Sequence, residues 1–268
     1  MHFRRLRGGA APLVLVHGFG CSLTDWNAQL AHFGSRNDTV APDLRGHGAT
    51  PGTADECSME IYGADVAALL DQLALEHAVL VGHSMGCRVV LEAARRAPHR
   101  VAGLVLIDGS RGGTGERASA EQRTRSMLAA AGYSSFAGRF FADMFLANAD
   151  PAIKARAIEQ AARLPAATGA ALLQRMSGWD AAEMESALDA VAGPLLVIQS
   201  TCLNADRVRT PIRPGETTPW IELVRSRVPG ARVEVITGVG HFPQIEAADR
   251  VNALLEEFGA RLAQNLRP

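Results

Sequence analysis

Largely apolar runs of strand length recur along this chain and alternate with longer segments in which apolar residues repeat at helical spacing. The runs fall at residues 13–16, 78–81, 101–107 and 195–199, and residues 232–236 alternate between polar and apolar. The segments of helical spacing fall at residues 26–33, 58–73, 85–97, 218–228 and 247–262. Continuous apolar runs are typical of strands that are covered on both faces. The pattern therefore predicts an α/β protein with a mostly parallel sheet between layers of helices.

The pattern changes between residues 111 and 188. This segment contains helical stretches rich in Ala, Arg, Met and Phe, and it has no apolar run of strand length. Pro151, Pro165 and Gly178 interrupt it, and breaks of this kind separate helices. We expect a core formed by residues 1–110 and 189–268, and a helical cap, residues 111–188, that lies over the ends of the strands.

Ser84 stands between two glycines, Gly82 and Gly86, directly after one apolar run and directly before a helical segment. A serine in this pattern between a strand and a helix is the signature of a nucleophile elbow. The turn is so sharp that only glycine-sized neighbours leave room for it. The N-terminus of the following helix favours negative charge near the hydroxyl. This context indicates a nucleophilic serine.

Composition and charge narrow the functional classes. The chain has 268 residues, 47% of them hydrophobic, and its formal net charge of −1 lacks the basic character of nucleic-acid-binding proteins. It has no run of the ~18 apolar residues that a membrane span requires, and no apolar segment that would make a signal peptide. The four cysteines form no CxxC pair, and no His/Cys/Asp cluster has metal-ligand spacing. We therefore expect a cytoplasmic protein with reduced thiols and with neither a metal nor another cofactor.

Four short motifs follow successive predicted strands, and their order is informative. They are His17-Gly18-Phe19-Gly20, Asp43-Leu44-Arg45-Gly46-His47-Gly48, Gly82-His83-Ser84-Met85-Gly86 and Gly238-Val239-Gly240-His241-Phe242. With these motifs the chain resembles the α/β-hydrolase fold superfamily over nearly its whole length. The resemblance implies an eight-stranded sheet, a helical cap after the sixth strand and a Ser-His-acid triad. Because too few residues precede Leu13 for the usual N-terminal hairpin, we expect the first strand to be missing.

The residue types at these positions suit acyl transfer. A serine hydroxyl becomes a good nucleophile when an imidazole takes its proton, and His241 follows the last predicted strand at the same edge of the sheet as Ser84. The tetrahedral intermediate also needs two N–H donors, which form an oxyanion hole. Met85, the residue after the nucleophile, is expected to supply one, and the resemblance implies that Phe19 supplies the other.

The third member of the triad is ambiguous in the sequence. In the commonest family pattern the acid follows the seventh strand by a few positions, but Leu203 occupies that position here and Asp206 comes three residues later. The loop that contains Asp206 is longer than usual and rich in proline. The alternative is Asp108, at the tip of the sixth strand, where some relatives place their acid. We favour Asp108 as the triad acid and keep Asp206 as the alternative. Asp108 could also be a structural aspartate that bonds loop N–H groups.

Three other histidines are expected to have structural roles. We expect His17 to tie the loop that carries Phe19 to its neighbours, and His47 to bond the backbone of its own loop. His83 precedes the nucleophile and, because side chains alternate along a strand, it should point into the fold.

The aromatic and methionine side chains of the predicted cap and of the late loop are candidates for substrate contact. We select Phe140, Met144, Trp179 and Trp220, although such residues at helical spacing also form the core of a cap. Several arginines lie near the predicted mouth of the site, namely Arg111, Arg125, Arg139, Arg209 and Arg213. We treat these as surface charges, and the binding of a substrate carboxylate by one of them is a hypothesis.

The sequence therefore predicts a serine hydrolase that cleaves a small or medium carboxylic ester or lactone through an acyl-serine intermediate. Two alternatives use the same triad, namely hydrolysis of a carbon–carbon bond and cofactor-free perhydrolysis. An alternative of another class is a non-catalytic ligand-binding protein that keeps the fold. The expected partner is a small ester-like molecule, with no nucleic acid and no membrane span, and a homodimer is left open.

Overall fold

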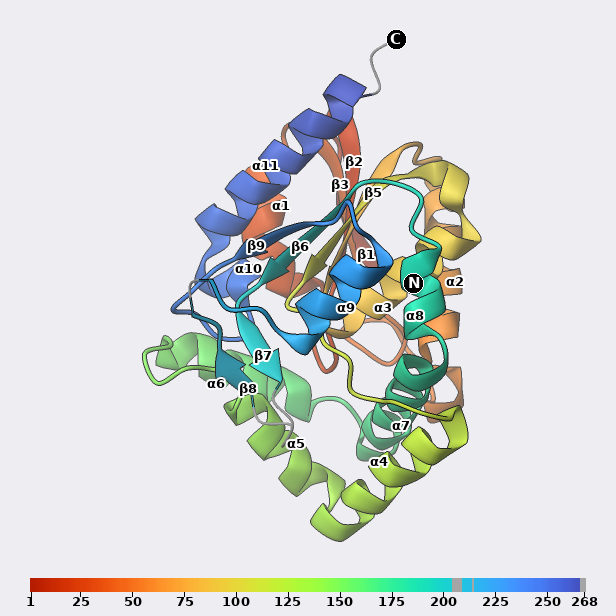
Figure 1. Ribbon diagram of the computed structural model, residues 1–268, viewed down its shortest axis with the longest axis vertical. Coiled ribbons are helices and arrows are strands. Elements are labelled where there is room, and N and C mark those ends of the chain that lie inside the picture. Colours follow the sequence, from red (N-terminus) through yellow and green to blue (C-terminus); the bar gives the residue numbers. More distant parts are fainter. Residues whose placement is uncertain (204–208, 214, 266–268) are drawn as a thin grey trace.

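The core is a seven-stranded β-sheet with the strand order β1-β3-β2-β4-β5-β6-β9 (Figure 1). The structure, a computed structural model, describes residues 1–203, 209–213 and 215–265. The strands are β1 (Phe3–Leu6), β2 (Ala10–Val16), β3 (Asn37–Pro42), β4 (Ala78–His83), β5 (Val101–Ile107), β6 (Leu195–Gln199) and β9 (Arg232–Val235). Neighbouring strands are parallel except β1 and β3, which run antiparallel at one edge. The mostly parallel sheet predicted from the apolar runs is confirmed.

The inner strands are buried on both faces, which explains their unbroken apolar sequences. Successive side chains of a strand point to opposite faces of the sheet. In β2, Val14 and Val16 belong to one apolar cluster. Leu13 and Leu15, which alternate with them, belong to a second cluster on the other face. Helices α2 (Met59–Gln72) and α3 (Met85–Arg96) cover the first face, and α1 (Asn27–Phe33) and α11 (Ala248–Asn265) cover the second (Figure 1).

The N-terminal edge of the sheet agrees with the expectation of a missing first strand. The family resemblance implies eight strands, whereas seven pair in the sheet formed by the described residues. Here the chain enters directly as β1, and Phe3 pairs with Pro42 of β3 in antiparallel register.

Five helices fill the chain between β5 and β6. They are α4 (Arg117–Ala131), α5 (Tyr133–Ala142), α6 (Pro151–Ala162), α7 (Ala166–Ala182) and α8 (Met184–Asp189). In Figure 1, α4 to α7 lie together beyond the carboxyl ends of the strands, and α8 contacts α3 on the way back to the sheet. These helices occupy the segment for which the sequence predicts a helical insertion. The division of the chain into a core and a separate cap stays a prediction.

The segment after β6 contains a short hairpin that the sequence analysis treated as loop. Strand β7 (Thr201–Leu203) pairs antiparallel with β8 (Arg209–Pro211), and α9 (Pro219–Arg227) follows. Strands of three residues carry too little periodicity to be recognised in a sequence. The hairpin brings β8 back beside the ends of β5 and β6, next to the candidate site (Figure 1). A short helix, α10 (Pro243–Glu246), connects the segment after β9 with α11.

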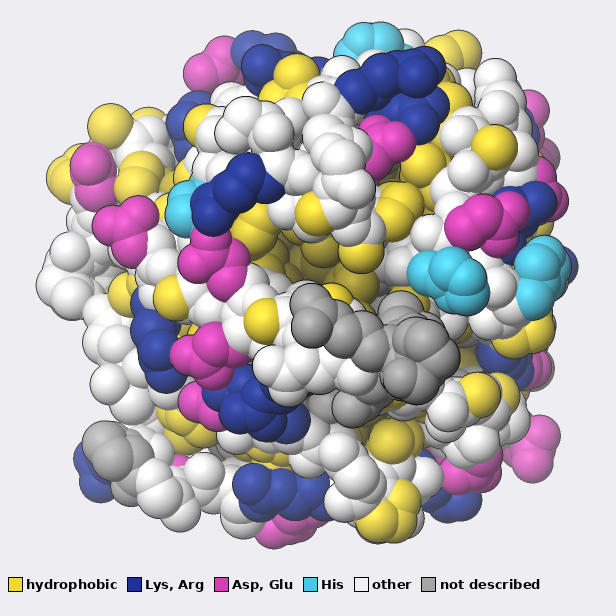
Figure 2. All heavy atoms as spheres, turned by 90° about the horizontal axis from the view of Figure 1, so that it is seen from above, with side chains coloured by type: hydrophobic (Ala, Val, Ile, Leu, Met, Phe, Trp, Pro, Cys, Tyr) yellow, Lys and Arg dark blue, Asp and Glu magenta, His cyan; other side chains and the backbone are white. Residues whose placement is uncertain are grey.

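The surface carries charges of both signs. Figure 2 shows one face of the molecule, on which basic and acidic side chains are interspersed around a hollow lined with hydrophobic side chains. This mixture fits the formal net charge of −1. Of the helices that the structure describes, none combines the length and the apolarity needed to cross a bilayer.

Candidate active site

Ser84 lies at the tight turn between β4 and α3. Strand β4 ends at His83 and helix α3 begins at Met85, so Ser84 alone makes the turn, with φ 55° and ψ −112°. A positive φ is strained for a serine. A Cβ atom on Gly82 would come within 2.3 Å of the Gly86 carbonyl oxygen, and one on Gly86 within 2.3 Å of the Val16 oxygen. The strand–turn–helix geometry that the motif predicts is therefore present, and both glycines are required by contact.

Three side chains from distant parts of the chain meet at the carboxyl ends of the strands. The Oγ atom of Ser84 is 2.8 Å from Nε2 of His241, and Nδ1 of His241 is 2.5 Å from Oδ2 of Asp108. Ser84 follows β4, Asp108 follows β5, and His241 follows β9. His241 and Asp108 are almost completely buried. The structure thus brings the predicted nucleophile, the predicted base and the favoured acid into one hydrogen-bonded row. Asp206, the alternative acid, lies outside the described residues.

Besides His241, several other groups donate hydrogen bonds to the carboxylate of Asp108. Oδ1 accepts from the backbone amides of Ser200 and Thr201, both at 2.8 Å. The Ser200 hydroxyl lies 3.1 Å from the same oxygen and donates at 2.7 Å to the Gly240 carbonyl oxygen. Oδ2 accepts from the Thr201 hydroxyl and, at 3.2 Å, from Nη1 of Arg209. Asp108 therefore bonds loop N–H groups, as a structural aspartate would, and also reaches His241.

Burial and neighbouring charges shift the pKa values of this pair. Burial of Asp108 would raise its pKa, but the hydrogen bond and charge of His241, together with Arg209, outweigh burial and lower the pKa to about 2. Burial is the main cause that lowers the pKa of His241 to about 4, and the positive charge of Arg209 adds to it. At neutral pH the arrangement is therefore an ionised carboxylate beside a neutral imidazole, which can accept a proton at Nε2.

Arg209 is a residue whose position the sequence analysis did not foresee. We expected a surface charge, but the side chain is only 7% exposed and lies beside Asp108. Its Nη1 also donates to the Thr201 hydroxyl at 2.7 Å. The β7–β8 hairpin places the arginine there, since Arg209 pairs with Leu203 across the hairpin. Nothing in a proline-rich segment indicates that it folds back, so the sequence offered no signal for this contact.

The loop that carries Phe19 lies against Ser84. A Cβ atom on Gly18 would sit 3.2 Å from Cβ of Ser84. Met85 is the first residue of α3, a position whose amide has no partner inside the helix. Within the described part of the chain, the backbone amides of Phe19 and Met85 have no hydrogen-bond acceptor. Two amide donors are thus available near Ser84.

His17 and His47 fix the loop that carries Phe19. The amide of Leu44 donates to Nε2 of His17 at 3.0 Å, and Nδ1 of His17 lies 2.8 Å from the Gly18 carbonyl oxygen. The amide of Gly20 donates to Nε2 of His47 at 3.1 Å. Burial lowers the pKa of His17 to about 3 and that of His47 to about 4, so both rings are neutral acceptors at neutral pH. The structural roles predicted for these two histidines are confirmed.

His83 contacts the backbone of His241, the predicted base. Its side chain is buried, as strand alternation predicts, and its Nε2 donates to the carbonyl oxygen of His241 at 2.7 Å. The amide of His241 donates in turn to the carbonyl oxygen of Met144 at 2.7 Å. Hydrogen bonds therefore hold the backbone of His241 at both its carbonyl oxygen and its amide.

A buried ion pair joins α3 to α7 beside Ser84. Arg88 donates through Nε and Nη2 to the two oxygens of Asp180, at 2.6 and 2.8 Å, and both side chains are almost fully buried. Arg88 also donates to the carbonyl oxygens of Ser84 and Ser110, at 3.2 and 2.6 Å. The amide of Gly112 donates to Asp180 at 2.6 Å. The sequence analysis missed this pair. Its one signal is that Arg88 lies one helical turn after Ser84, on the same face of α3.

A cavity of about 260 Å³ opens beside Ser84. Its apolar wall comes from the loop after β2, from the helices between β5 and β6 and from β7. It includes Phe19, Met127, Phe136, Phe140, Leu173, Met176 and Leu203. Its polar part includes Arg88, Ser110, Asp180 and Arg209. Of the four predicted substrate contacts, Phe140 lines this cavity.

The other three predicted contacts are not among the described residues that line this cavity, and their contact with substrate stays a prediction. Trp179 is completely buried and donates from its indole nitrogen to Glu92 of α3 at 3.1 Å, so it anchors α7 to the core. Met144 is buried and reaches the site only through the backbone bond to His241. Trp220 packs on Gly109 and lines a different cavity. Helical spacing identified buried faces but not which of them turn toward Ser84.

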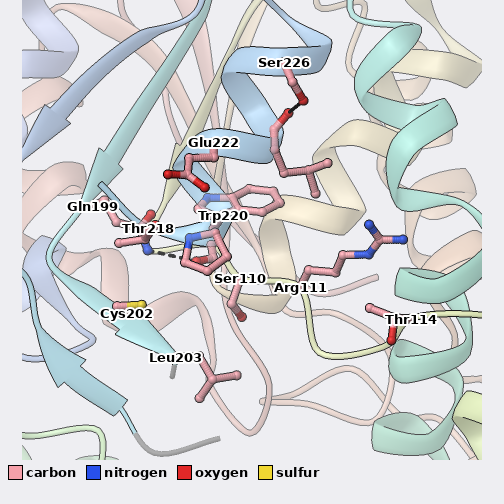
Figure 3. A pocket seen from close by; sticks show the side chains of 13 residues that line it. Ser110, Arg111, Thr114, Gln199, Cys202, Leu203, Thr218, Trp220, Glu222 and Ser226 are labelled. Atoms are coloured by element: carbon pink, nitrogen blue, oxygen red, sulfur yellow. Dashed lines mark hydrogen bonds between the residues drawn. The ribbon is translucent and has the colours of Figure 1, made fainter. Parts of the chain in front are cut away.

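Figure 3 shows the cavity lined by Trp220, with Ser110 and Leu203 among the side chains around it. It has a volume of about 520 Å³, and Ser110 and Leu203 line both cavities. Arg111 lies at its edge and pairs with Glu185 at 2.8 Å (Figure 3). In the described residues, no group of three or more His, Cys, Asp or Glu side chains could hold a metal ion here or elsewhere. The expectation of no cofactor stays a prediction.

Comparison with known proteins identifies the family. The sequence model of the "Alpha/beta hydrolase family" matches residues 13–254. The chain belongs to the alpha/beta hydrolase family. This α/β hydrolase is 30% identical over 250 residues to the dihydrolipoyllysine-residue acetyltransferase component of the acetoin cleaving system of Pseudomonas putida. The match covers 93% of this chain but only 64% of that protein, so the chain spans about two thirds of the length of its relative.

Solved structures agree with the family. The α/β hydrolase is similar to a thermophilic esterase from Thermogutta terrifontis, with a TM-score of 0.79, 24% identity, and coverage of 97% of this chain and 93% of the esterase. It is also similar to the enol-lactonase from Burkholderia xenovorans LB400, with a TM-score of 0.78, 22% identity, and coverage of 96% and 95%. At these identities the likeness shows a shared fold.

Proposed function

We propose that this α/β hydrolase cleaves a small or medium carboxylic ester or lactone through an acyl-serine intermediate. The observation that carries the proposal is the row Ser84–His241–Asp108, with 2.8 Å between Ser84 Oγ and His241 Nε2 and 2.5 Å between His241 Nδ1 and Asp108 Oδ2. A protein that only binds a ligand has no need of a strained serine aligned with a buried imidazole. This alignment favours an enzyme over the non-catalytic alternative.

In the proposed reaction, Ser84 Oγ attacks the carbonyl carbon of the ester while Nε2 of His241 takes the hydroxyl proton. The carboxylate of Asp108 accepts a hydrogen bond from the Nδ1–H group of His241 and stabilises the imidazolium that forms. The oxyanion of the tetrahedral intermediate accepts from the amides of Phe19 and Met85, each worth about 3 kcal/mol of transition-state stabilisation. Collapse of the intermediate expels the alcohol, which receives the proton from His241. Water then attacks the acyl-serine in a second round of the same steps.

The cavity supports the proposed substrate size. A volume of about 260 Å³ is small for a ligand site, and the apolar side chains around it suit an acyl chain or a ring. The helices between β5 and β6 supply most of this apolar wall. We propose that residues 111–188 act as a cap that closes the site and selects the acyl group.

A covalent probe tests the nucleophile directly. An alkyl fluorophosphonate is expected to form one adduct with the protein, seen as a single mass increase and mapped to the peptide that contains Ser84. The same protein should release nitrophenol from 4-nitrophenyl butyrate, and the phosphonate should stop that release in proportion to labelling.

Two variants control this experiment. Ser84→Ala should neither take up the phosphonate nor release nitrophenol, whereas Ser134→Ala, which removes an exposed hydroxyl from α5, should behave like the unaltered protein. An adduct on another residue, or undiminished ester cleavage by Ser84→Ala, would overturn the proposal.

The pH dependence of kcat/KM is expected to report the lowered pKa of His241. The base works only when its imidazole is neutral, so activity is lost as the pH falls through its pKa in the free enzyme. Because that pKa is lowered to about 4, activity should persist at pH values where an ordinary histidine, with a pKa of about 6.5, is already protonated. Initial rates across the acidic range measure this, with circular dichroism at each pH to verify that the fold persists. A midpoint near that of an ordinary histidine would contradict the expectation.

A further inference from the structure

We propose that Arg209 binds an anionic group of the substrate, so that the preferred ester or lactone carries a carboxylate. This inference rests on the proposed function and names its substrate class. Arg209 lines the cavity that contains Ser84, and its side chain is only 7% exposed. A buried guanidinium requires a matching anion.

The anion that Arg209 contacts is the carboxylate of Asp108, which has more hydrogen-bond donors around it than it can accept from. Asp108 is the carboxylate within hydrogen-bond distance of Arg209 in the described part of the chain, at 3.2 Å. A carboxylate has about four lone-pair positions, yet five donor groups surround that of Asp108. The Ser200 hydroxyl is also near, but its single hydrogen has a closer acceptor in the Gly240 carbonyl oxygen, at 2.7 Å. Arg209 is the most distant of the five donors. Among the residues that the structure describes, the charge of Arg209 is therefore only partly compensated.

The other cation of the cavity differs in this respect. Arg88 faces both oxygens of Asp180 at 2.6 and 2.8 Å and donates to two carbonyl oxygens besides. The N–H groups of Arg88 therefore donate to acceptors within the protein. The bonds of Arg209 to Asp108 and Thr201 both use one nitrogen, Nη1, of a group with five N–H donors. Of the two cations, Arg209 is therefore the one suited to a substrate anion.

The position of Arg209 also opposes catalysis unless an anion joins it. During the reaction His241 gains a proton, and the negative charge of Asp108 stabilises the resulting imidazolium. A guanidinium 3.2 Å from the same carboxylate offsets that charge, and it contributes to the lowered pKa of His241. A substrate carboxylate beside Arg209 would neutralise the guanidinium and restore the field that favours proton transfer. The substrate would thus complete the charge balance of the site.

The lining of the cavity defines the rest of the substrate. Phe136, Phe140 and Met176 form an apolar wall, and Arg209 and Ser110 belong to its polar part. An apolar body with one carboxylate matches this division. Nitrophenyl esters of adipic acid allow a direct comparison, because mono-4-nitrophenyl adipate is an anion and its methyl ester, methyl 4-nitrophenyl adipate, is neutral and otherwise identical in acyl chain and leaving group.

The experiment measures kcat/KM for both esters in the unaltered protein, Arg209→Gln, Arg209→Lys and Arg125→Gln. The unaltered protein should prefer the anionic ester by about tenfold or more, the range expected for a charge-assisted hydrogen bond. Arg209→Gln should abolish the preference by lowering kcat/KM for the anionic ester, while kcat/KM for the neutral ester should rise, because the guanidinium no longer offsets the charge of Asp108. Arg209→Lys should keep part of the preference. Arg125→Gln removes the same charge from an exposed position on α4 and should retain the full preference.

A purely structural role for Arg209, such as holding the hairpin to Asp108, predicts a different result. Arg209→Gln would then lower kcat/KM for both esters by the same factor and lower the melting temperature. That result, or an equal rate for the two esters in the unaltered protein, would overturn the proposal.

A binding measurement separates this inference from the proposed function. Titration calorimetry of Ser84→Ala with monomethyl adipate and with dimethyl adipate requires no turnover. Ser84→Ala should bind monomethyl adipate more tightly than dimethyl adipate, and the double variant Ser84→Ala/Arg209→Gln should lose this difference. That result would support the anion site even if no ester were cleaved. Equal binding of the two compounds would refute the anion site even if esters were cleaved.

Discussion

Asp108→Asn is expected to lower kcat for 4-nitrophenyl butyrate by about 10⁴-fold, the loss seen when the acid of a serine triad becomes an amide. The amide cannot stabilise the imidazolium, and it favours the wrong tautomer of His241. Asparagine is the appropriate substitution because its carbonyl oxygen can still accept from the amides of Ser200 and Thr201, which bond Oδ1 of Asp108 at 2.8 Å. The hydrogen bonds of that loop should therefore persist.

Asp206→Asn is the matched control for this measurement. It makes the same chemical change in the alternative acid of the sequence analysis, and turnover should stay close to that of the unaltered protein. Steady-state kinetics of the two variants, together with their melting temperatures, decide the assignment. A large loss of kcat in Asp206→Asn, with normal kcat in Asp108→Asn, would identify Asp206 as the triad acid. Asp108 would then be a structural aspartate.

Asp180→Ala is expected to lower the free energy of unfolding by about 3–5 kcal/mol, because it leaves a buried guanidinium without its anion. Arg88 and Asp180 are 3% and 1% exposed, so water cannot replace the lost carboxylate. Chemical denaturation measures the change. Arg88 also donates to the carbonyl oxygen of Ser84 at 3.2 Å. A displaced Arg88 should therefore shift Ser84, and kcat should fall as well as stability.

Two further variants define the origin of this effect. Glu159→Ala breaks an exposed pair between α6 and Arg163, the residue that follows this helix, and should change stability by no more than about 0.5 kcal/mol. The double variant Arg88→Met/Asp180→Leu replaces the pair by apolar groups of similar volume and should recover much of the lost stability. If Asp180→Ala were as stable as Glu159→Ala, the pair would not be a buried anchor.

The parts of the site that the sequence predicts well are those encoded within a few neighbouring residues. The turn at Ser84 follows from glycines that would clash with backbone if they carried a Cβ atom, so the motif itself specifies the geometry. The inward direction of His83 follows from strand alternation. His17 and His47 each lie within a short loop motif, where bonds to nearby backbone are the default for a buried imidazole.

The parts that the sequence could not predict depend on contacts between distant segments. Arg209 and Asp108 are 101 residues apart, and Arg88 and Asp180 are 92 residues apart. No local period records which arginine is buried against which carboxylate. The same limit applies to Trp179 and Trp220, because amphipathic spacing marks a face as buried without stating whether it meets the core, one cavity or another.

The sequence by itself determined the mostly parallel sheet, the helical segment between β5 and β6, and the turn that presents Ser84, because apolar periodicity and glycine spacing act over a few residues. Only the tertiary structure decided that Asp108 reaches His241 across 133 residues of chain, and that a hairpin turns Arg209 from an expected surface charge into a neighbour of that acid. The physical reason is that charge pairing and cavity shape depend on which distant segments pack together, and packing of that kind leaves no repeat in the order of the residues.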